Sequence, residues 1–284
     1  MRALASLAVL AITTACVHGN LDTAGTVTID AGSFTMGSSL DSRSRAIEQA
    51  ARSGSDARGA VASVRAELSE HRVRIAAFHI MIHPVTQDEY ARFVWSTGAP
   101  EPWIDAASAA RQESVCSVPA TQPPSRYAWH EGRPQPARVD EPAVLVSRVE
   151  AEAYCQWWGE QHGGFGSLPS EAQWERAARG VDGRDYPWGD RFVPEHANTR
   201  EHGMGDVQPV AARPGAASPE GVLDVAGNVA EWTAGGERGL AVVKGAAWSD
   251  PHWAARAPAR RLVPPVVRHV AIGFRCVLDP TPRP

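Results

Sequence analysis

The chain of 284 residues lacks the features that mark several classes of protein. It has no run of Lys or Arg, and its net charge is −4 with a pI near 6.2, so nothing in it attracts a phosphate backbone and nucleic acid is disfavoured as a partner. Beyond the N-terminus no stretch approaches the ~18 apolar residues of a membrane-spanning helix. The composition therefore predicts a globular protein without a transmembrane segment.

The N-terminus contains a short apolar segment. Met1-Arg2 followed by Ala3 to Ile12 has the pattern of an export signal, too short to span a bilayer stably. Cys16 follows a small residue, as in bacterial lipoprotein processing sites, although Thr13 replaces the usual aliphatic residue. We expect residues 1–16 to be the signal and residues 17–26 a tether. Lipidation at Cys16 would attach the protein to a membrane. The alternatives are ordinary signal-peptidase cleavage nearby, or a buried thiol in an uncleaved segment.

Cysteine is scarce, with four residues in the whole chain. If Cys16 is acylated or removed, Cys116, Cys155 and Cys276 remain, which in an oxidising compartment allows one disulfide and one leftover thiol. Cys116 lies in a Ser-rich stretch with no obvious partner. From the export signal we expect the protein in the periplasm or attached to the outer membrane of a bacterial envelope.

Tryptophan and turn-forming residues are plentiful: ten Trp, 25 Gly and 22 Pro. They predict many turns and irregular loops fixed by large aromatic side chains. Strand-like patterns cover Val27 to Asp30 and Val73 to Ile82, while residues 39–70 have apolar residues at helical spacing and indicate a surface helical insertion. Residues 98–142 have the composition of a long loop, ordered or partly mobile.

Three short amphipathic helices are predicted by the same start signal, a Ser or Thr whose side chain caps the helix and a Glu or Gln three residues later. The pairs are Thr86 with Glu89, Ser147 with Glu150, and Ser170 with Gln173. From Val181 onward no helical pattern persists, and short strands are expected at Val242-Val243 and at Gly273 to Leu278. The fold class is therefore α+β, irregular and rich in loops, with small twisted antiparallel sheets.

Several segments, taken in order, resemble the formylglycine-generating-enzyme (sulfatase-modifying-factor) family. The resemblance covers about residues 27–279 and implies a variant of the C-type-lectin-like fold. The matching segments are Ile29 to Gly37, Pro84 to Phe93, Ala151 to Trp157, Leu168 to Glu175, Pro187-Trp188-Gly189, Asp224 to Trp232, Lys244 to Trp248, and Gly273 to Cys276.

The departures from the family pattern bear on activity. In active members a Lys-Gly-Gly-Ser-aromatic stretch is followed by two cysteines, five residues apart, that hold Cu(I) for oxygen activation. This sequence has Asp250 and Ala255 there, and neither a carboxylate nor a methyl group replaces a thiolate ligand of a soft monovalent ion. Ala246 and Ala247 replace the second Gly and the Ser, and Ser167 replaces the usual Arg before Leu168. Copper is therefore not expected.

Other residues take their expected roles from the resemblance. Cys155 and Cys276 occupy positions that form a disulfide in the family, and closing a loop of about 120 residues would stabilise the fold by roughly 4 kcal/mol. Asn228 and Glu231 lie where family members bind Ca²⁺ through oxygen ligands. The alternative is structural: Asn228 tolerates a left-handed turn and Glu231 caps or pairs locally.

The altered stretch also contains polar and aromatic residues that would suit a new binding cleft, against the simpler interpretation of a surface loop. These are Trp248, Asp250, His252, Trp253 and Arg256. We expect a non-oxidising binding or accessory module of the cell envelope, whose ligand is a peptide, a glycan or an envelope protein, because long loops on a fixed frame carry recognition. The alternative is an oxidoreductase of the formylglycine-generating type that modifies a cysteine or another side chain of an exported protein.

Overall fold

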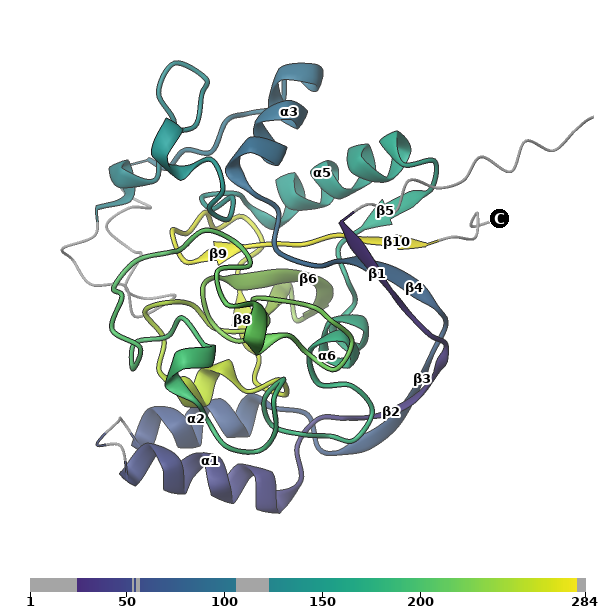
Figure 1. Ribbon diagram of the computed structural model, residues 1–284, viewed down its shortest axis with the longest axis vertical. Helices are drawn as coiled ribbons and strands as arrows, with labels where there is room; N and C mark the ends of the chain where they lie inside the picture. Colours follow the sequence, from purple (N-terminus) through teal and green to yellow (C-terminus); the bar gives the residue numbers. More distant parts are fainter. Residues whose placement is uncertain (1–24, 53, 55–56, 106–122, 280–284) are drawn as a thin grey trace, which may run out of the picture.

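A computed structural model describes residues 25–52, 54, 57–105 and 123–279 (Figure 1). The predicted export signal, Cys16 and Cys116 lie outside these residues. Among the described residues no helix is both long enough and apolar enough to cross a membrane. The helices are α1 (Leu40–Arg52), α2 (Ala57–Ala66), α3 (Gln87–Thr97), α5 (Arg148–Gln161) and α6 (Glu171–Arg179), with short 3-10 turns η2 (Pro124–Arg126), η3 (Pro136–Arg138), η4 (Pro194–His196), η5 (Pro214–Ala216) and η6 (His252–Ala255).

Three small sheets hold these helices together. The strands are β1 (Thr26–Ile29), β2 (Gly32–Met36), β3 (His71–Ile75), β4 (Phe78–Met81), β5 (Phe165–Ser167), β6 (Ala230–Glu237), β7 (Leu240–Lys244), β8 (Arg261–Val263), β9 (Ile272–Gly273) and β10 (Val277–Asp279). One sheet has the order β1-β4-β10-β5, a second is the pair β2-β3, and the third has the order β8-β7-β6-β9. All neighbours are antiparallel except β6 and β9. The architecture is the irregular α+β type expected from the sequence.

The three predicted helix starts are confirmed. Thr86, Ser147 and Ser170 each accept a hydrogen bond from the backbone N–H three residues on, and the Glu or Gln side chain there accepts one from the backbone N–H of the cap. Each box therefore satisfies amide groups that a helix start leaves without a partner. The predicted single strand from Val73 to Ile82 is instead two strands, β3 and β4, which belong to different sheets.

The largest part of the core lies where α3 and α5 cover the sheets. Tyr90 and Tyr154 stack with ring centroids 5.7 Å apart, and Phe274 packs edge-on against both. Close approach of α5 to β5 depends on two glycines, because a Cβ atom on Gly159 would lie 2.0 Å from the backbone nitrogen of Gly166. These contacts fix the second half of the chain against the first.

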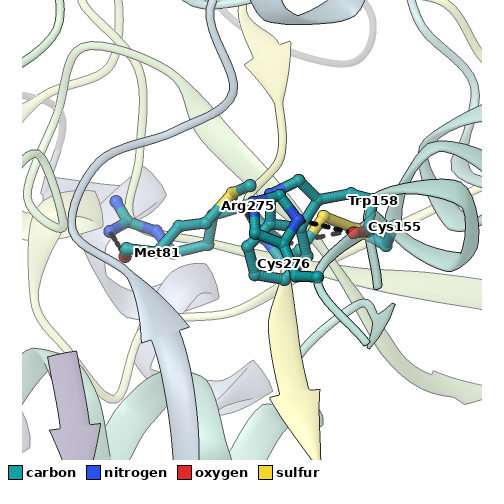
Figure 2. Close-up of a disulfide and its surroundings, with 6 residues drawn as sticks. Met81, Cys155, Trp158, Arg275 and Cys276 are labelled. Atoms are coloured by element: carbon teal, nitrogen blue, oxygen red, sulfur yellow. Dashed lines mark hydrogen bonds between the residues drawn. A yellow bond between two sulfur atoms is a disulfide. The ribbon is translucent and has the colours of Figure 1, made fainter. Parts of the chain in front are cut away.

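A disulfide links α5 to the segment before β10. Cys155 and Cys276 are bonded, with Cα atoms 5.4 Å apart, as the resemblance implied. The Cys276 N–H lies 3.4 Å from Met81 Sδ, and the Met81 N–H donates to the Cys276 carbonyl at 3.0 Å (Figure 2). The backbone at the disulfide is therefore also attached to β4. Three segments distant in sequence thus meet at one cross-link.

The helical insertion consists of α1 and α2, which lie side by side at the end of the molecule opposite α3 (Figure 1). The two ends of the insertion meet: the Ser38 N–H donates to the Leu68 carbonyl at 3.0 Å, and the Glu70 N–H to the Ser38 carbonyl at 3.1 Å. Both helices pack on η6, the turn that contains Ala255. The insertion therefore covers the part of the fold in which the family's cysteine pair is replaced.

Candidate functional site

The altered stretch begins where β7 ends and is held tightly to the Gly-Asn-Val-Ala-Glu-Trp turn. Gly227 N–H donates to the Gly245 carbonyl at 2.6 Å, and Trp248 N–H donates to the Asn228 carbonyl at 3.0 Å. Gly245 has φ 91°, and a Cβ atom there would lie 2.9 Å from Cζ2 of Trp174, so the position needs glycine. The backbone of the stretch is fixed before any functional side chain is placed.

Asp250 and Ala255, at the two positions of the family's cysteine pair, are both buried. The Asp250 side chain is 2% exposed, its Oδ2 accepts from the Ala247 N–H at 3.0 Å, and Arg261 Nη2 lies 3.0 Å from the same oxygen. Ala255 is 0% exposed and offers only a methyl group. Both cysteines in the described residues are consumed by the disulfide, so the described part of the chain holds no free thiolate for Cu(I).

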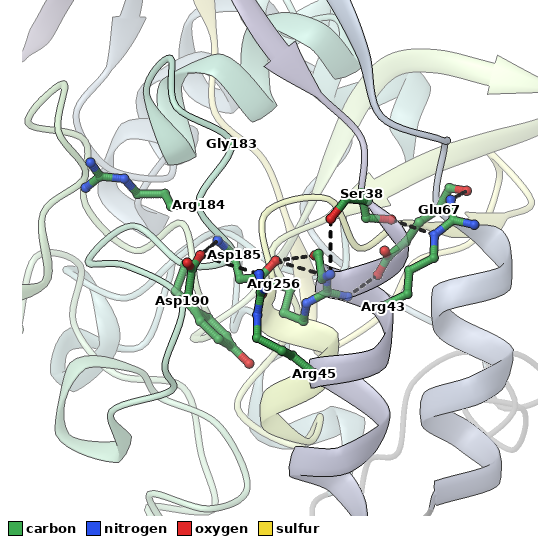
Figure 3. A network of polar contacts seen from close by, with 12 residues as sticks. Ser38, Arg43, Arg45, Glu67, Gly183, Arg184, Asp185, Asp190 and Arg256 are labelled. Carbon is green, nitrogen blue, oxygen red and sulfur yellow. Dashed lines mark hydrogen bonds and ion pairs between the residues drawn. The ribbon is translucent and has the colours of Figure 1, made fainter.

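Arg256 ties the helical insertion to the core (Figure 3). Its Nη1 donates to Glu67 Oε1 at 2.6 Å, and its Nη2 donates to Asp185 Oδ1 at 3.1 Å and to the hydroxyl of Ser42. All these side chains are buried. Burial raises the pKa of the Glu67 carboxyl, and the Arg256 charge opposes that rise. Arg256 is thus a structural link that joins α1 and the residue after α2 to the loop between α6 and η4.

His252 is the residue of the altered stretch that faces a large cavity. Its Nδ1 lies 3.1 Å from Glu201 Oε1, and its backbone N–H donates to Glu201 Oε2 at 2.9 Å. Burial raises the pKa of the Glu201 carboxyl and the hydrogen bonds from His252 lower it, with a net lowering. The Phe192 ring packs 5.0 Å from the imidazole. The cavity has a volume of about 720 Å³.

The five residues of the predicted cleft do not share one cavity. His252 lines the cavity just described, and Trp253 lines a second one of about 320 Å³ beside α2, together with Lys244 and Ala246. Trp248, Asp250 and Arg256 are buried in the protein. The prediction grouped these side chains because they are close in the chain, but in the fold they face different surroundings.

Three residues of the larger cavity were missed by sequence reasoning: Glu201, Arg191 and Phe192. They lie in an irregular segment that contains no periodic pattern. No local signal connects Glu201 with His252, which is 51 residues further along the chain. Only the fold brings them together.

The predicted calcium residues make contacts that do not suit a cation. Glu231 accepts from Arg275 Nε and Nη2, both at 2.7 Å, and from Trp174 Nε1 at 2.8 Å, with the Glu231 and Arg275 side chains both 0% exposed. Asn228, with φ 67°, accepts at Oδ1 from Asn198 Nδ2 and from the Gln208 N–H. Since N–H groups and a guanidinium face these oxygens, the geometry does not fit Ca²⁺. Among the described residues no group of three or more His, Cys, Asp or Glu side chains is arranged to hold a metal.

Comparison with known proteins agrees with the resemblance noted in the sequence. The family model described as the sulfatase-modifying factor enzyme 1-like domain matches residues 14–280. The chain is 29% identical to inactive C-alpha-formylglycine-generating enzyme 2 of Bos taurus, over 91% of this chain and 89% of that one. It is 32% identical to formylglycine-generating enzyme of Streptomyces coelicolor, over 74% of this chain and 68% of that one.

A solved structure gives the same fold. PvdO from Pseudomonas aeruginosa superimposes with a TM-score of 0.65 at 25% identity, covering 89% of this chain and 94% of that one. The relatives include proteins named as inactive and a hercynine oxygenase from Mycolicibacterium thermoresistibile, so the family holds both oxidising and inactive members. On these matches, the chain belongs to the sulfatase-modifying factor (formylglycine-generating enzyme) family.

Proposed function

We propose that this chain is a non-oxidising member of its family and acts as a binding or accessory module in the bacterial envelope. The proposal depends on the residues that stand at the positions of the family's cysteine pair. The Asp250 carboxylate is buried and held by the Ala247 N–H and Arg261, so it is occupied in structural contacts. Ala255 adds no ligand atom. Copper-dependent oxidation of a cysteine has no soft ligand set here among the described residues.

The arrangement of the helical insertion supports the same proposal. The helices α1 and α2 pack directly on η6, and Arg256 holds them there through Glu67 and Ser42. Beside η6 lies the cavity of about 720 Å³, which is lined by α1 of the insertion and by polar side chains. Cavities of this size with a few convergent polar groups are typical of small-molecule binding sites.

An aldehyde assay tests the proposal. The mature protein is incubated with Cu(I), oxygen and a sulfatase-type cysteine peptide, and the peptide mass is measured. We expect no conversion of cysteine to formylglycine, and no tight copper uptake by the metal-loaded and desalted protein. Aldehyde formation would instead support the alternative, an oxidoreductase of the formylglycine-generating type.

Export is the second part of the proposal. The N-terminal segment with its Cys16 supports a lipid-anchored protein on the periplasmic side or the outer membrane. Expression of the full chain in a bacterium with radiolabelled palmitate should label the protein, and Cys16→Ser should abolish the label. Unlabelled wild-type protein in the cytosolic fraction would contradict export.

A further inference from the structure

A second, much smaller cavity adjoins the segment that forms one wall of the larger cavity. Pro194 and Glu201 of this segment line the larger cavity, of about 720 Å³. Between them in the chain, His196 and Asn198 line a separate cavity of about 10 Å³, together with Arg213. A volume of that size is about what one water-sized molecule occupies.

The side-chain amide of Asn198 is fixed in one orientation. Its Nδ2 donates to the Asp206 carbonyl at 3.0 Å and to Asn228 Oδ1 at 3.1 Å, which uses both hydrogens of the amide. Asn198 is 2% exposed, and its Oδ1 accepts a hydrogen bond from no described residue. A buried acceptor without a donor is costly, so this oxygen calls for one.

Two more buried atoms of the same cavity lining have no hydrogen-bond partner among the described residues, His196 Nδ1 and Arg213 Nη1. The guanidinium is held by its other nitrogen, because Arg213 Nη2 donates to Gln208 Oε1 at 2.7 Å. The imidazole is held by Trp188, whose ring meets it edge-on with centroids 5.1 Å apart. Three side chains around one small cavity therefore each have a buried polar atom to satisfy.

The chemistry of these atoms determines what the cavity can hold. Arg213 Nη1 only donates and Asn198 Oδ1 only accepts, so the occupant must both accept and donate hydrogen bonds. A metal cation would face the guanidinium charge, and a halide has no hydrogen to donate to Asn198. Among molecules that both donate and accept, a cavity of about 10 Å³ admits only water.

We propose that this cavity binds one water molecule, which attaches the wall of the larger cavity to Arg213. The water accepts from Arg213 Nη1 and donates to Asn198 Oδ1 and to His196 Nδ1, so the neutral imidazole carries its proton on Nε2. Arg213 is a positioning residue, since it acts through the water on the segment that carries Pro194 and Glu201. The inference does not depend on whether the larger cavity binds a ligand.

Magnetic relaxation dispersion of ¹⁷O in solutions of the mature protein counts the water molecules that stay bound for longer than the protein takes to tumble. Arg213→Met should lower this count by one relative to the wild type. Gln208→Leu is the matched control, because it removes the other hydrogen bond of Arg213 and leaves the lining of the small cavity intact; its count should equal that of the wild type. An equal count in Arg213→Met and the wild type overturns the proposal.

The imidazole gives a second measurement, which needs no variant. Long-range ¹H–¹⁵N NMR of the wild type at about pH 8, where histidine is neutral, should show the His196 proton on Nε2, and a proton on Nδ1 overturns the proposed hydrogen bonds. The positioning role is tested by hydrogen exchange at the backbone N–H groups of His196 and Ala197, which bond within the same segment. Exchange there should be about fivefold faster in Arg213→Met than in Gln208→Leu, and equal rates overturn that role.

Discussion

Replacing Glu231 by Gln should cost this protein a large part of its stability. The carboxylate accepts two hydrogen bonds from Arg275, both at 2.7 Å, and one from Trp174 Nε1 at 2.8 Å, in a place where neither charged side chain is exposed. An amide keeps a single accepting oxygen and leaves the Arg275 charge buried without a counter-ion. Breaking a buried ion pair in this way costs about 3–5 kcal/mol.

The measurement is thermal and urea unfolding followed by circular dichroism. With about 2–4 °C per kcal/mol for domains of roughly this size, the midpoint should fall by roughly 10 °C. Glu237→Gln is the matched control, because Glu237 lies on the same strand, is 45% exposed and reaches Arg260 only at 3.5 Å; it should change stability by less than about 0.5 kcal/mol. The double variant Glu231→Gln/Arg275→Met should be less destabilised than the sum of its two single variants.

The same experiment distinguishes a Glu231–Arg275 ion pair from a calcium site at Glu231. If Glu231 pairs with Arg275, chelation with EDTA should leave the wild-type unfolding midpoint unchanged. A loss below about 1 kcal/mol for Glu231→Gln, or a calcium-dependent rise in the midpoint that this variant lacks, would refute the reasoning.

Three further predictions concern cross-links and protonation. Cys155→Ser/Cys276→Ser should lose about 4–5 kcal/mol in urea unfolding, because the bond closes a separation of 121 residues. Burial raises the pKa of the Glu141 carboxyl from 4.5 to about 7. The stability that protonated Glu141 contributes is complete below about pH 4.5 and is lost as the pH rises through about 7. In Glu141→Gln the unfolding midpoint should therefore vary less with pH between about pH 5 and about pH 8 than in the wild type. Arg256→Met should cost about 3–5 kcal/mol and expose α1 and α2 to limited proteolysis, and adding Glu67→Gln should restore part of the loss; equal cleavage of wild type and variant would contradict the link.

Features that depend on neighbouring residues were predictable from the sequence. The caps at Thr86, Ser147 and Ser170 are correct because a capping box is complete within four residues. The left-handed backbone of Asn228 is equally local. By contrast, Val73 to Ile82 has one continuous alternating pattern, and only pairing with β2 on one side and with β1 and β10 on the other divides it into two strands.

The candidate site depended on contacts that no local pattern contains. Arg256 meets Glu67 across 189 residues and Asp185 across 71, and His252 meets Glu201 across 51. Clustering in sequence predicted a shared cleft for Asp250, His252 and Arg256. In the fold Asp250 contacts Arg261, His252 contacts Glu201 and Arg256 contacts Glu67. The resemblance could not supply Glu67 as a partner, because Glu67 belongs to the insertion, which lies outside the matching segments.

The meeting of Ser38 with Leu68 and Glu70 brings the two ends of the helical insertion together. Since the chain leaves and re-enters the frame at nearly one point, a short linker in place of residues 40–66 would preserve the pairing of β2 with β3. Such an excision would expose η6 to solvent. We expect the same junction to accept a helical pair from a relative while the pairing of β2 with β3 stays unaltered.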